Sequence, residues 1–96
     1  MKTMEQLVAV GLTEKKAEDV MLLERAMLEH AVKFSYTKKD GSVREANGTL
    51  RRDMMEGWQP KGEARPEPPS ILRYFDLDAM DWRCFNVLNF LSMQAI

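Results

Sequence analysis

Residues 31–50, AVKFSYTKKDGSVREANGTL, determine how the rest of the sequence is interpreted. Val32, Phe34 and Tyr36 alternate with polar residues, which is typical of a β-strand with one buried face. The pair Asp40-Gly41 then marks the turn of a hairpin. A hairpin alone is only marginally stable in water, so the remaining residues must supply more strands or a helix to cover it.

The length of the turn sets which residues face each other in this hairpin. A two-residue turn would place polar residues opposite the apolar ones on the buried face. A three-residue loop, Lys39-Asp40-Gly41 with a left-handed Gly41, instead places Phe34 opposite Ala46 and Val32 opposite Gly48. We therefore predict the three-residue loop.

Two helices are predicted before the hairpin, a short one over about 4–10 and a longer one over about 14–30. Thr3 begins a capping box, Gly11 lies where the first helix should stop, and Thr13 caps the second. Apolar residues recur at helical spacing in the second helix and form one stripe: Ala17, Val20, Leu23, Met27 and Ala31. This stripe should cover a sheet or contact a second copy of the chain.

The second half of the chain contains a proline-rich stretch followed by three apolar segments. All four prolines lie in a predicted exposed loop over 57–69. Strands are expected at 70–77, at 82–85 and in the last segment, 90–96, with a one-turn helix capped by Asn86 before the last strand. The prediction is an α+β fold: an N-terminal helical hairpin (1–30) and a five-stranded SH3-like β-barrel (31–96) in one compact domain, with barrel closure removing the free strand edges.

Composition excludes several classes of protein. The 96 residues carry a net charge of −1, which argues against a strongly basic nucleic-acid binder. The N-terminus does not resemble a signal peptide and no apolar run could span a membrane, so a cytoplasmic protein without membrane contact is expected. Cys84 and His30 are the only residues of their types, which predicts no metal, no cofactor and no catalytic residues, with Cys84 as a small buried hydrophobe.

Two stretches carry a resemblance to a known family. Residues 33–50 (KFSYTKKDGSVREANGTL) and 74–90 (YFDLDAMDWRCFNVLNF), separated by the proline-rich loop, resemble the small WYL-like, Sm-like SH3 β-barrel proteins of Bacteroidetes and their phages. The resemblance implies the barrel fold and no established activity for the small members. It also suggests a phage or mobile-element origin.

Larger WYL-type regulators join such a barrel to a DNA-binding domain, and an arginine shortly before a phenylalanine in their last hairpin faces the ligand. The resemblance places Arg83, two residues before Phe85, at that position. However, this chain has no Trp-Tyr-Leu tripeptide, and two helices stand where a DNA-reading domain would be expected. Both differences argue against a role as a regulator.

Basic and aromatic residues of the barrel are the candidate ligand-binding residues, because guanidinium groups bind phosphate and carboxylate oxygens and stack on rings. The predicted set is Arg44, Arg83, Arg73, Tyr36 and Lys38. The alternative is that each arginine pairs with a nearby acid such as Glu45, Asp53, Asp76 or Asp81.

Two functions remain open from the sequence. The first is a non-enzymatic binding or accessory protein whose barrel arginines engage an anionic ligand, a nucleotide or nucleic acid. The second is a protein–protein adaptor, for example a host-defence inhibitor. It would use the face of helix 14–30 or the proline-rich loop to bind a host protein or to form a homodimer through the N-terminal helix.

Overall fold

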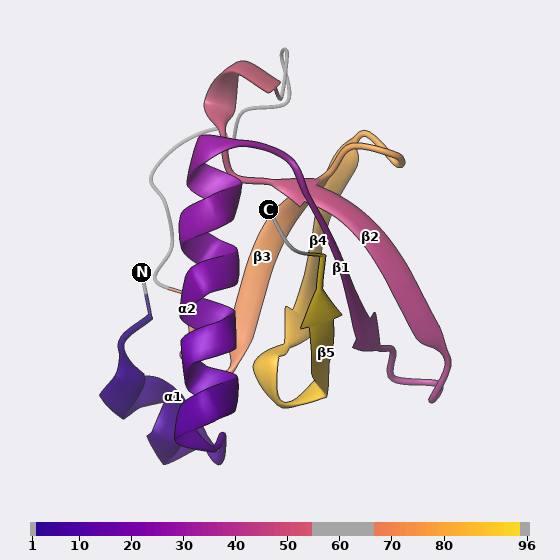
Figure 1. The fold of residues 1–96 in the computed structure, drawn as a ribbon. Helices are drawn as coiled ribbons and strands as arrows, with labels where there is room; N and C mark the ends of the chain where they lie inside the picture. The colour runs from indigo at the N-terminus through magenta and orange to yellow at the C-terminus, as the bar shows by residue number, and fades with distance from the viewer. Residues whose placement is uncertain (1, 55–66, 95–96) are drawn as a thin grey trace.

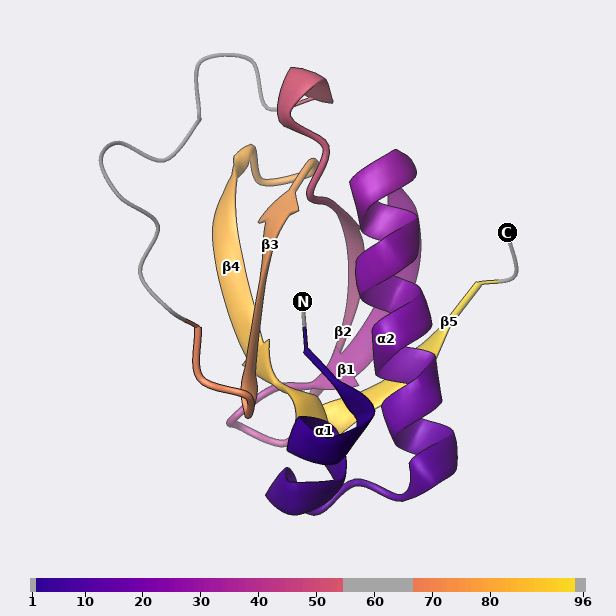
Figure 2. The ribbon, with the colours of Figure 1, turned by 90° about the vertical axis from the view of Figure 1, so that its left-hand side faces the viewer.

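A computed structural model describes residues 2–54 and 67–94. Two helices precede a five-stranded antiparallel sheet, and both helices lie on one side of it (Figures 1 and 2). The elements are α1 (Met4–Val10), α2 (Glu14–Glu29), β1 (Val32–Thr37), β2 (Val43–Thr49), the 3-10 turn η1 (Arg52–Met54), β3 (Ile71–Asp76), β4 (Asp81–Asn86), the 3-10 turn η2 (Val87–Asn89) and β5 (Phe90–Met93). The predicted α+β fold class is confirmed.

The predicted caps form at both helices. Thr3 and Gln6 make a reciprocal capping box at the start of α1, and Gly11 ends this helix with a φ of 126°. The Thr13 side chain accepts a hydrogen bond from the Lys16 backbone N–H (3.2 Å) and so begins α2. The caps at Thr3 and Thr13 therefore determine where the two helices start.

The β1–β2 hairpin has the predicted register. Phe34 lies opposite Ala46 and Val32 opposite Gly48. The Gly41 backbone N–H donates to the Lys38 carbonyl (3.0 Å), and Gly41 adopts a φ of 88°. Positive φ is strained for other residues, so glycine at this position permits the three-residue loop.

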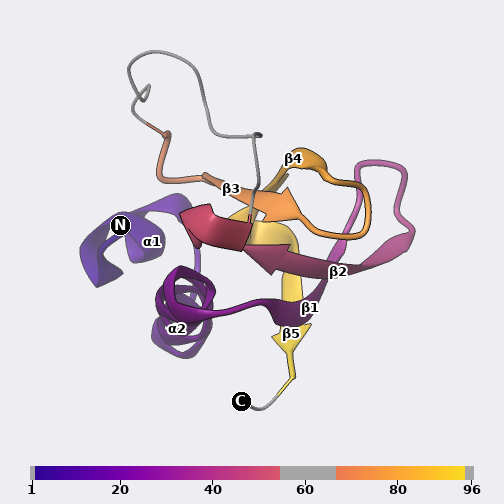
Figure 3. The same cartoon turned by 90° about the horizontal axis from the view of Figure 1, so that it is seen from above.

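The strands of the sheet follow the order β4-β3-β2-β1-β5 and curl around the core (Figure 3). Sequence predicted that closure would remove the free edges, and this detail is wrong. Within the described residues the hydrogen-bonded ladder ends at β4 and β5 and does not join them. The Asn86 side chain caps η2 by accepting from the Leu88 backbone N–H (2.9 Å), and this turn directs β5 to pair with β1 instead.

The inward face of α2 packs on the inner face of the sheet. Four residues of the predicted stripe are buried there (Ala17, Val20, Leu23 and Met27), together with aromatic residues of the strands. The stripe therefore covers the chain's own sheet, which is one of the two outcomes expected for it. Among the described residues, no helix is long and apolar enough to cross a membrane.

Cys84 corrects another expectation, because it is exposed and not buried. It lies opposite Arg73 in the β3–β4 ladder, on the outward face of the sheet. Alternation along β4 places Phe85 and not Cys84 toward the core. Most of the predicted proline-rich loop, residues 57–66, lies outside the described residues.

Candidate ligand-binding site

Strand register brings two tyrosines and two arginines together. Tyr36 on β1 lies opposite Arg44 on β2, and Tyr74 on β3 lies opposite Arg83 on β4. Both tyrosines are buried, and their hydroxyl groups are hydrogen-bonded to each other at 2.8 Å. With Asp76, these four residues form what we call the tyrosine–arginine cluster.

Aromatic packing holds the two tyrosine rings in place. The Phe85 ring stacks on Tyr36 with a centroid distance of 4.4 Å and an interplanar angle of 11°. Phe34 and Tyr74 form a T-shaped pair with a centroid distance of 5.0 Å. Because several large rings are packed together, the hydroxyl pair is fixed by the core and does not depend on a mobile loop.

Asp76 holds Arg83 at the edge of the cluster. Its Oδ2 lies 3.0 Å from Arg83 Nε, and its Oδ1 accepts from the backbone N–H groups of Asp78 (2.9 Å) and Ala79 (3.2 Å). The Asp76 side chain is only 5% exposed, whereas that of Arg83 is 38% exposed. The contact is an ion pair without the alignment of a hydrogen bond, which leaves the buried Nε–H without an aligned acceptor.

Arg44 differs from Arg83 because it makes no ion pair with any acid among the described residues. It is half-buried on β2, and its positive charge lies close enough to act on the Tyr74 hydroxyl. A half-buried guanidinium without a carboxylate has its full charge available for another anion. Arg44 is therefore the available cation of the cluster.

Burial raises the pKa of Tyr74 well above that of an ordinary phenol. Tyr36, through its hydrogen bond and its electrostatic influence, raises the pKa of Tyr74 further, and so does the charge of Asp76. The positive charge of Arg44 lowers it. Tyr74 is consequently a neutral hydrogen-bonding group at physiological pH.

The structure separates the five predicted binding residues into groups. Tyr36, Arg44 and Arg83 come together in the cluster. Arg73 lies on the outward face of β3 and points away from it. Lys38 lies at the end of the β1–β2 hairpin, where its Nζ is 3.9 Å from Asp40 Oδ2.

The alternative that arginines pair with local acids holds for some of them. Arg83 pairs with Asp76, and Arg51 pairs with Asp53 at 2.8 Å. It does not hold for Arg44 within the described part of the chain. Sequence spacing alone could not separate these cases, because Arg83 and Asp76 come from different strands.

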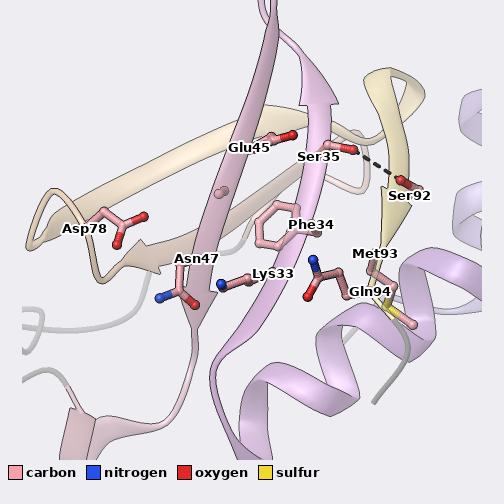
Figure 4. Close-up of a pocket in the computed structure, with 10 residues that line it drawn as sticks. Lys33, Phe34, Ser35, Glu45, Asn47, Asp78, Ser92, Met93 and Gln94 are labelled. Carbon is pink, nitrogen blue, oxygen red and sulfur yellow. Dashed lines mark hydrogen bonds between the residues drawn. The ribbon is translucent and has the colours of Figure 1, made fainter.

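A separate hollow of about 390 Å³ contains none of the five predicted residues (Figure 4). Its lining comes from β1, β2, β5 with the following Gln94, and the β3–β4 turn, and seven of its ten residues are polar. Sequence reasoning missed this hollow. The alternation of β1 and β2 could have grouped Lys33 and Ser35 with Glu45 and Asn47, but nothing local indicates that Asp78 and β5 form the remaining walls.

A metal centre finds no support in the described residues. No three His, Cys, Asp or Glu side chains within residues 2–54 and 67–94 group closely enough to hold an ion. The Nδ1 atom of His30 instead lies 2.8 Å from the Ala31 carbonyl oxygen, at the end of α2.

Comparison with known proteins identifies the family of this barrel. No curated protein and no solved structure gives a significant match to the chain. The family model WYL_2, described as an Sm-like SH3 β-barrel fold, matches residues 20–91, which is well over half of the chain. This span runs from α2 into β5 and includes the whole tyrosine–arginine cluster. The protein is therefore a member of the WYL_2 family of Sm-like SH3 β-barrels.

Proposed function

We propose that this protein is a non-enzymatic binding protein whose barrel engages an anionic ligand, a nucleotide or a single-stranded nucleic acid, through Arg44 and Arg83. The observation that carries the proposal is the half-buried Arg44, which has no carboxylate partner among the described residues. A cation in this position is stabilised by binding an anion. Phosphate is the anion that two guanidinium groups suit best.

The contacts of Arg83 give the proposal its second support. Asp76 fixes the side chain from the Nε side, and no hydrogen bond joins its terminal Nη atoms to a described residue. An arginine held in this way loses less conformational freedom when its outer edge binds a phosphate. Since Asp76 compensates one of the two arginine charges, the cluster keeps a net charge of about +1, which favours one phosphate group over a highly charged strand.

The adaptor function is the second candidate, with the face of α2 as its surface. The stripe that would have formed a homodimer is buried against the sheet, but Leu22 and Leu28 on α2 are 49% and 47% exposed. A host protein or a second copy would have to contact these side chains. Scattered exposed leucines are common on soluble proteins, so we favour the ligand-binding function.

A matched pair of variants tests the ligand-binding proposal. Fluorescence anisotropy with a labelled ten-nucleotide oligothymidylate, and NMR titration with adenosine monophosphate, measure the two classes of ligand. Arg44→Gln should weaken binding about tenfold or more, because charge-assisted hydrogen bonds contribute about 1.5–3 kcal/mol. Arg73→Gln, which removes the same charge from the outward face, should change binding by less than about twofold.

Equal losses in the two variants would show that binding reflects overall charge only, and would contradict the proposal. So would the absence of binding to either ligand by the wild type. Arg83→Lys serves as a further check, because it keeps the charge beside Asp76 but removes the planar fork. A cytoplasmic location and a phage or mobile-element origin stay predictions from the sequence.

A further inference from the structure

The polar hollow has the size of a small-ligand site. The outward face of β1 forms its floor, β2 and the β3–β4 turn form one wall, and β5 forms the other (Figure 4). Its volume of about 390 Å³ falls within the range of about 300–1,000 Å³ found for ligand pockets.

Hydrogen bonds between strands fix the walls of the hollow. The Gln94 backbone N–H donates to the Lys33 carbonyl (2.9 Å), and the Ser35 and Ser92 hydroxyl groups lie 3.2 Å apart. On the other side, the Leu77 backbone N–H donates to the Asn47 carbonyl (2.9 Å), which anchors the β3–β4 turn beside β2. The hollow is thus built on the backbone of the sheet, which fixes the positions from which its polar side chains extend.

One positively charged side chain, Lys33, and two negatively charged ones, Glu45 and Asp78, line this hollow. None of them forms an ion pair with another residue of the described part of the chain. Glu45 on β2 lies opposite Ser35 on β1. Lys33 is two residues before Ser35 on β1, so Lys33 and Glu45 share the outward face as diagonal neighbours. Diagonal neighbours of this kind are within reach of each other. An ammonium group and two carboxylates are therefore available together in one concave site.

These charges restrict the chemistry of the ligand. A dianion such as a nucleotide would face two carboxylates, and a purely apolar molecule would leave three charges without partners. A ligand that carries an ammonium and a carboxylate satisfies both signs. The amides of Asn47 and Gln94 can hydrogen-bond the peptide group between them.

We propose that the hollow binds a small zwitterion of the amino-acid or dipeptide class. The ammonium group of the ligand contacts Glu45 and Asp78, and its carboxylate contacts Lys33. This site shares no residue with the tyrosine–arginine cluster, so it goes beyond the proposed function and does not depend on it.

Three probes of nearly equal size test the proposal with the full chain. L-alanyl-L-alanine carries both charges, its N-acetyl derivative only the carboxylate, and its C-terminal amide only the ammonium. In ¹H–¹⁵N NMR titrations up to about 50 mM, the free dipeptide should shift the amide signals of residues 33, 45, 47, 78 and 94. Each blocked derivative should bind about tenfold more weakly, because it loses one charge-assisted contact.

Charge-neutral variants assign each contact. Glu45→Gln and Asp78→Asn should each weaken binding of the free dipeptide and of its amide, and Lys33→Gln should weaken the free dipeptide and its N-acetyl derivative. The exposed residues outside the hollow, Glu18 and Lys39, provide matched controls as Glu18→Gln and Lys39→Gln, and these should bind like the wild type. All five substitutions concern surface side chains, and a melting curve confirms the fold of each variant.

Three outcomes would overturn the proposal. The first is that no signal of the lining residues shifts at the highest concentration. The second is that a blocked derivative binds as well as the free dipeptide, which would mean that one of the two charges is not recognised. The third is that the shifts concentrate at Arg44 and Arg83, which would assign binding to the other site.

Discussion

Gly48 lies on β2 against two aromatic rings of the core. A Cβ atom at this position would be 2.6 Å from Tyr74 Cδ2 and 3.0 Å from Phe34 Cε1. Both rings are buried, so neither can move away easily. Glycine is thus required here by the close approach of the rings, whereas Gly41 is required by its positive φ.

Replacing Gly48 with alanine should reduce the free energy of unfolding by about 1–3 kcal/mol, because overpacking forces the aromatic rings to shift. Chemical denaturation monitored by circular dichroism measures the loss. Gly41→Asn is the comparison, because a Cβ at this position meets no atom within 4 Å and only the positive φ is a source of strain there. A Gly48→Ala variant as stable as the wild type would show that the core around Tyr74 is loosely packed.

The raised pKa of Tyr74 predicts a loss of stability at alkaline pH. The unfolded chain releases this phenolic proton near pH 10, while the folded protein retains it. Above about pH 10 the folded state therefore binds more protons, and its free energy of unfolding falls by up to about 1.4 kcal/mol per pH unit. Denaturation at pH 8–11 tests this, with Tyr74→Phe as the control that lacks the titrating group. Parallel pH profiles for the two proteins would contradict it.

At the level of elements, the end of α2 is tied to β2 through Met27. The Met27 side chain is fully buried, and its carbonyl accepts from the Thr49 hydroxyl (3.0 Å) and from the Leu50 backbone N–H (2.9 Å). Leu22 on the same helix is 49% exposed. Substitutions at Met27 and at Leu22 therefore test whether α2 mainly covers its own sheet or mainly contacts a partner.

Met27→Ala should reduce the free energy of unfolding by about 2–5 kcal/mol, as expected for a large-to-small change in a core. Leu22→Ala should change it by less than about 0.5 kcal/mol. Thermal denaturation combined with size-exclusion chromatography measures stability and oligomeric state together. If Leu22→Ala were the more damaging change and also altered the elution volume, α2 would be an intersubunit helix.

How much of this fold the sequence predicts depends on whether a signal is local. The caps at Thr3 and Thr13 and the loop at Gly41 act within a few residues, so their outcomes could be predicted. Exposure of Cys84 depends on which face of β4 packs inward, and this is set by contacts with other elements. For the candidate site, alternation could place Arg44 beside Tyr36, but the pairing of Arg83 with Asp76 required the β3–β4 register.

Glu24 is a charged residue on the buried face of α2. It lies four residues after Val20 and three before Met27, so it belongs to the same face as the apolar stripe, and burial raises its pKa. Its Oε1 accepts from the Lys2 backbone N–H (3.2 Å), and the charge of Lys2 opposes the rise in pKa. Only the path of the N-terminal residues, which precede α1, explains why a carboxylate is tolerated there.

At the scale of the whole molecule, Lys2 joins three segments that are far apart in the sequence. Its Nζ forms an ion pair with Glu67, which in turn accepts from the Arg73 backbone N–H at the start of β3 (2.6 Å). The Lys2 side chain is 5% exposed and that of Glu67 is 25% exposed. The N-terminus, α2 and the segment that enters β3 are thus held together by one small ionic network.

This network predicts an energetic coupling between Lys2 and Glu67. Lys2→Met should reduce the free energy of unfolding by about 1–2 kcal/mol, because it leaves Glu67 and the buried Glu24 without a compensating charge. In a double-mutant cycle with Glu67→Gln, the coupling energy should be about 1 kcal/mol or more, since the pair is largely shielded from water.

The exposed i,i+4 pair Lys15–Asp19, whose atoms lie 3.1 Å apart, is the matched control and should give about 0.3–0.5 kcal/mol. Because the Lys15–Asp19 pair is screened by solvent, 0.5 M salt should weaken its coupling and leave that of Lys2–Glu67 nearly unchanged. Equal coupling energies, or equal sensitivity to salt, would show that Lys2 lies at a solvated surface and does not tie the N-terminus to the barrel.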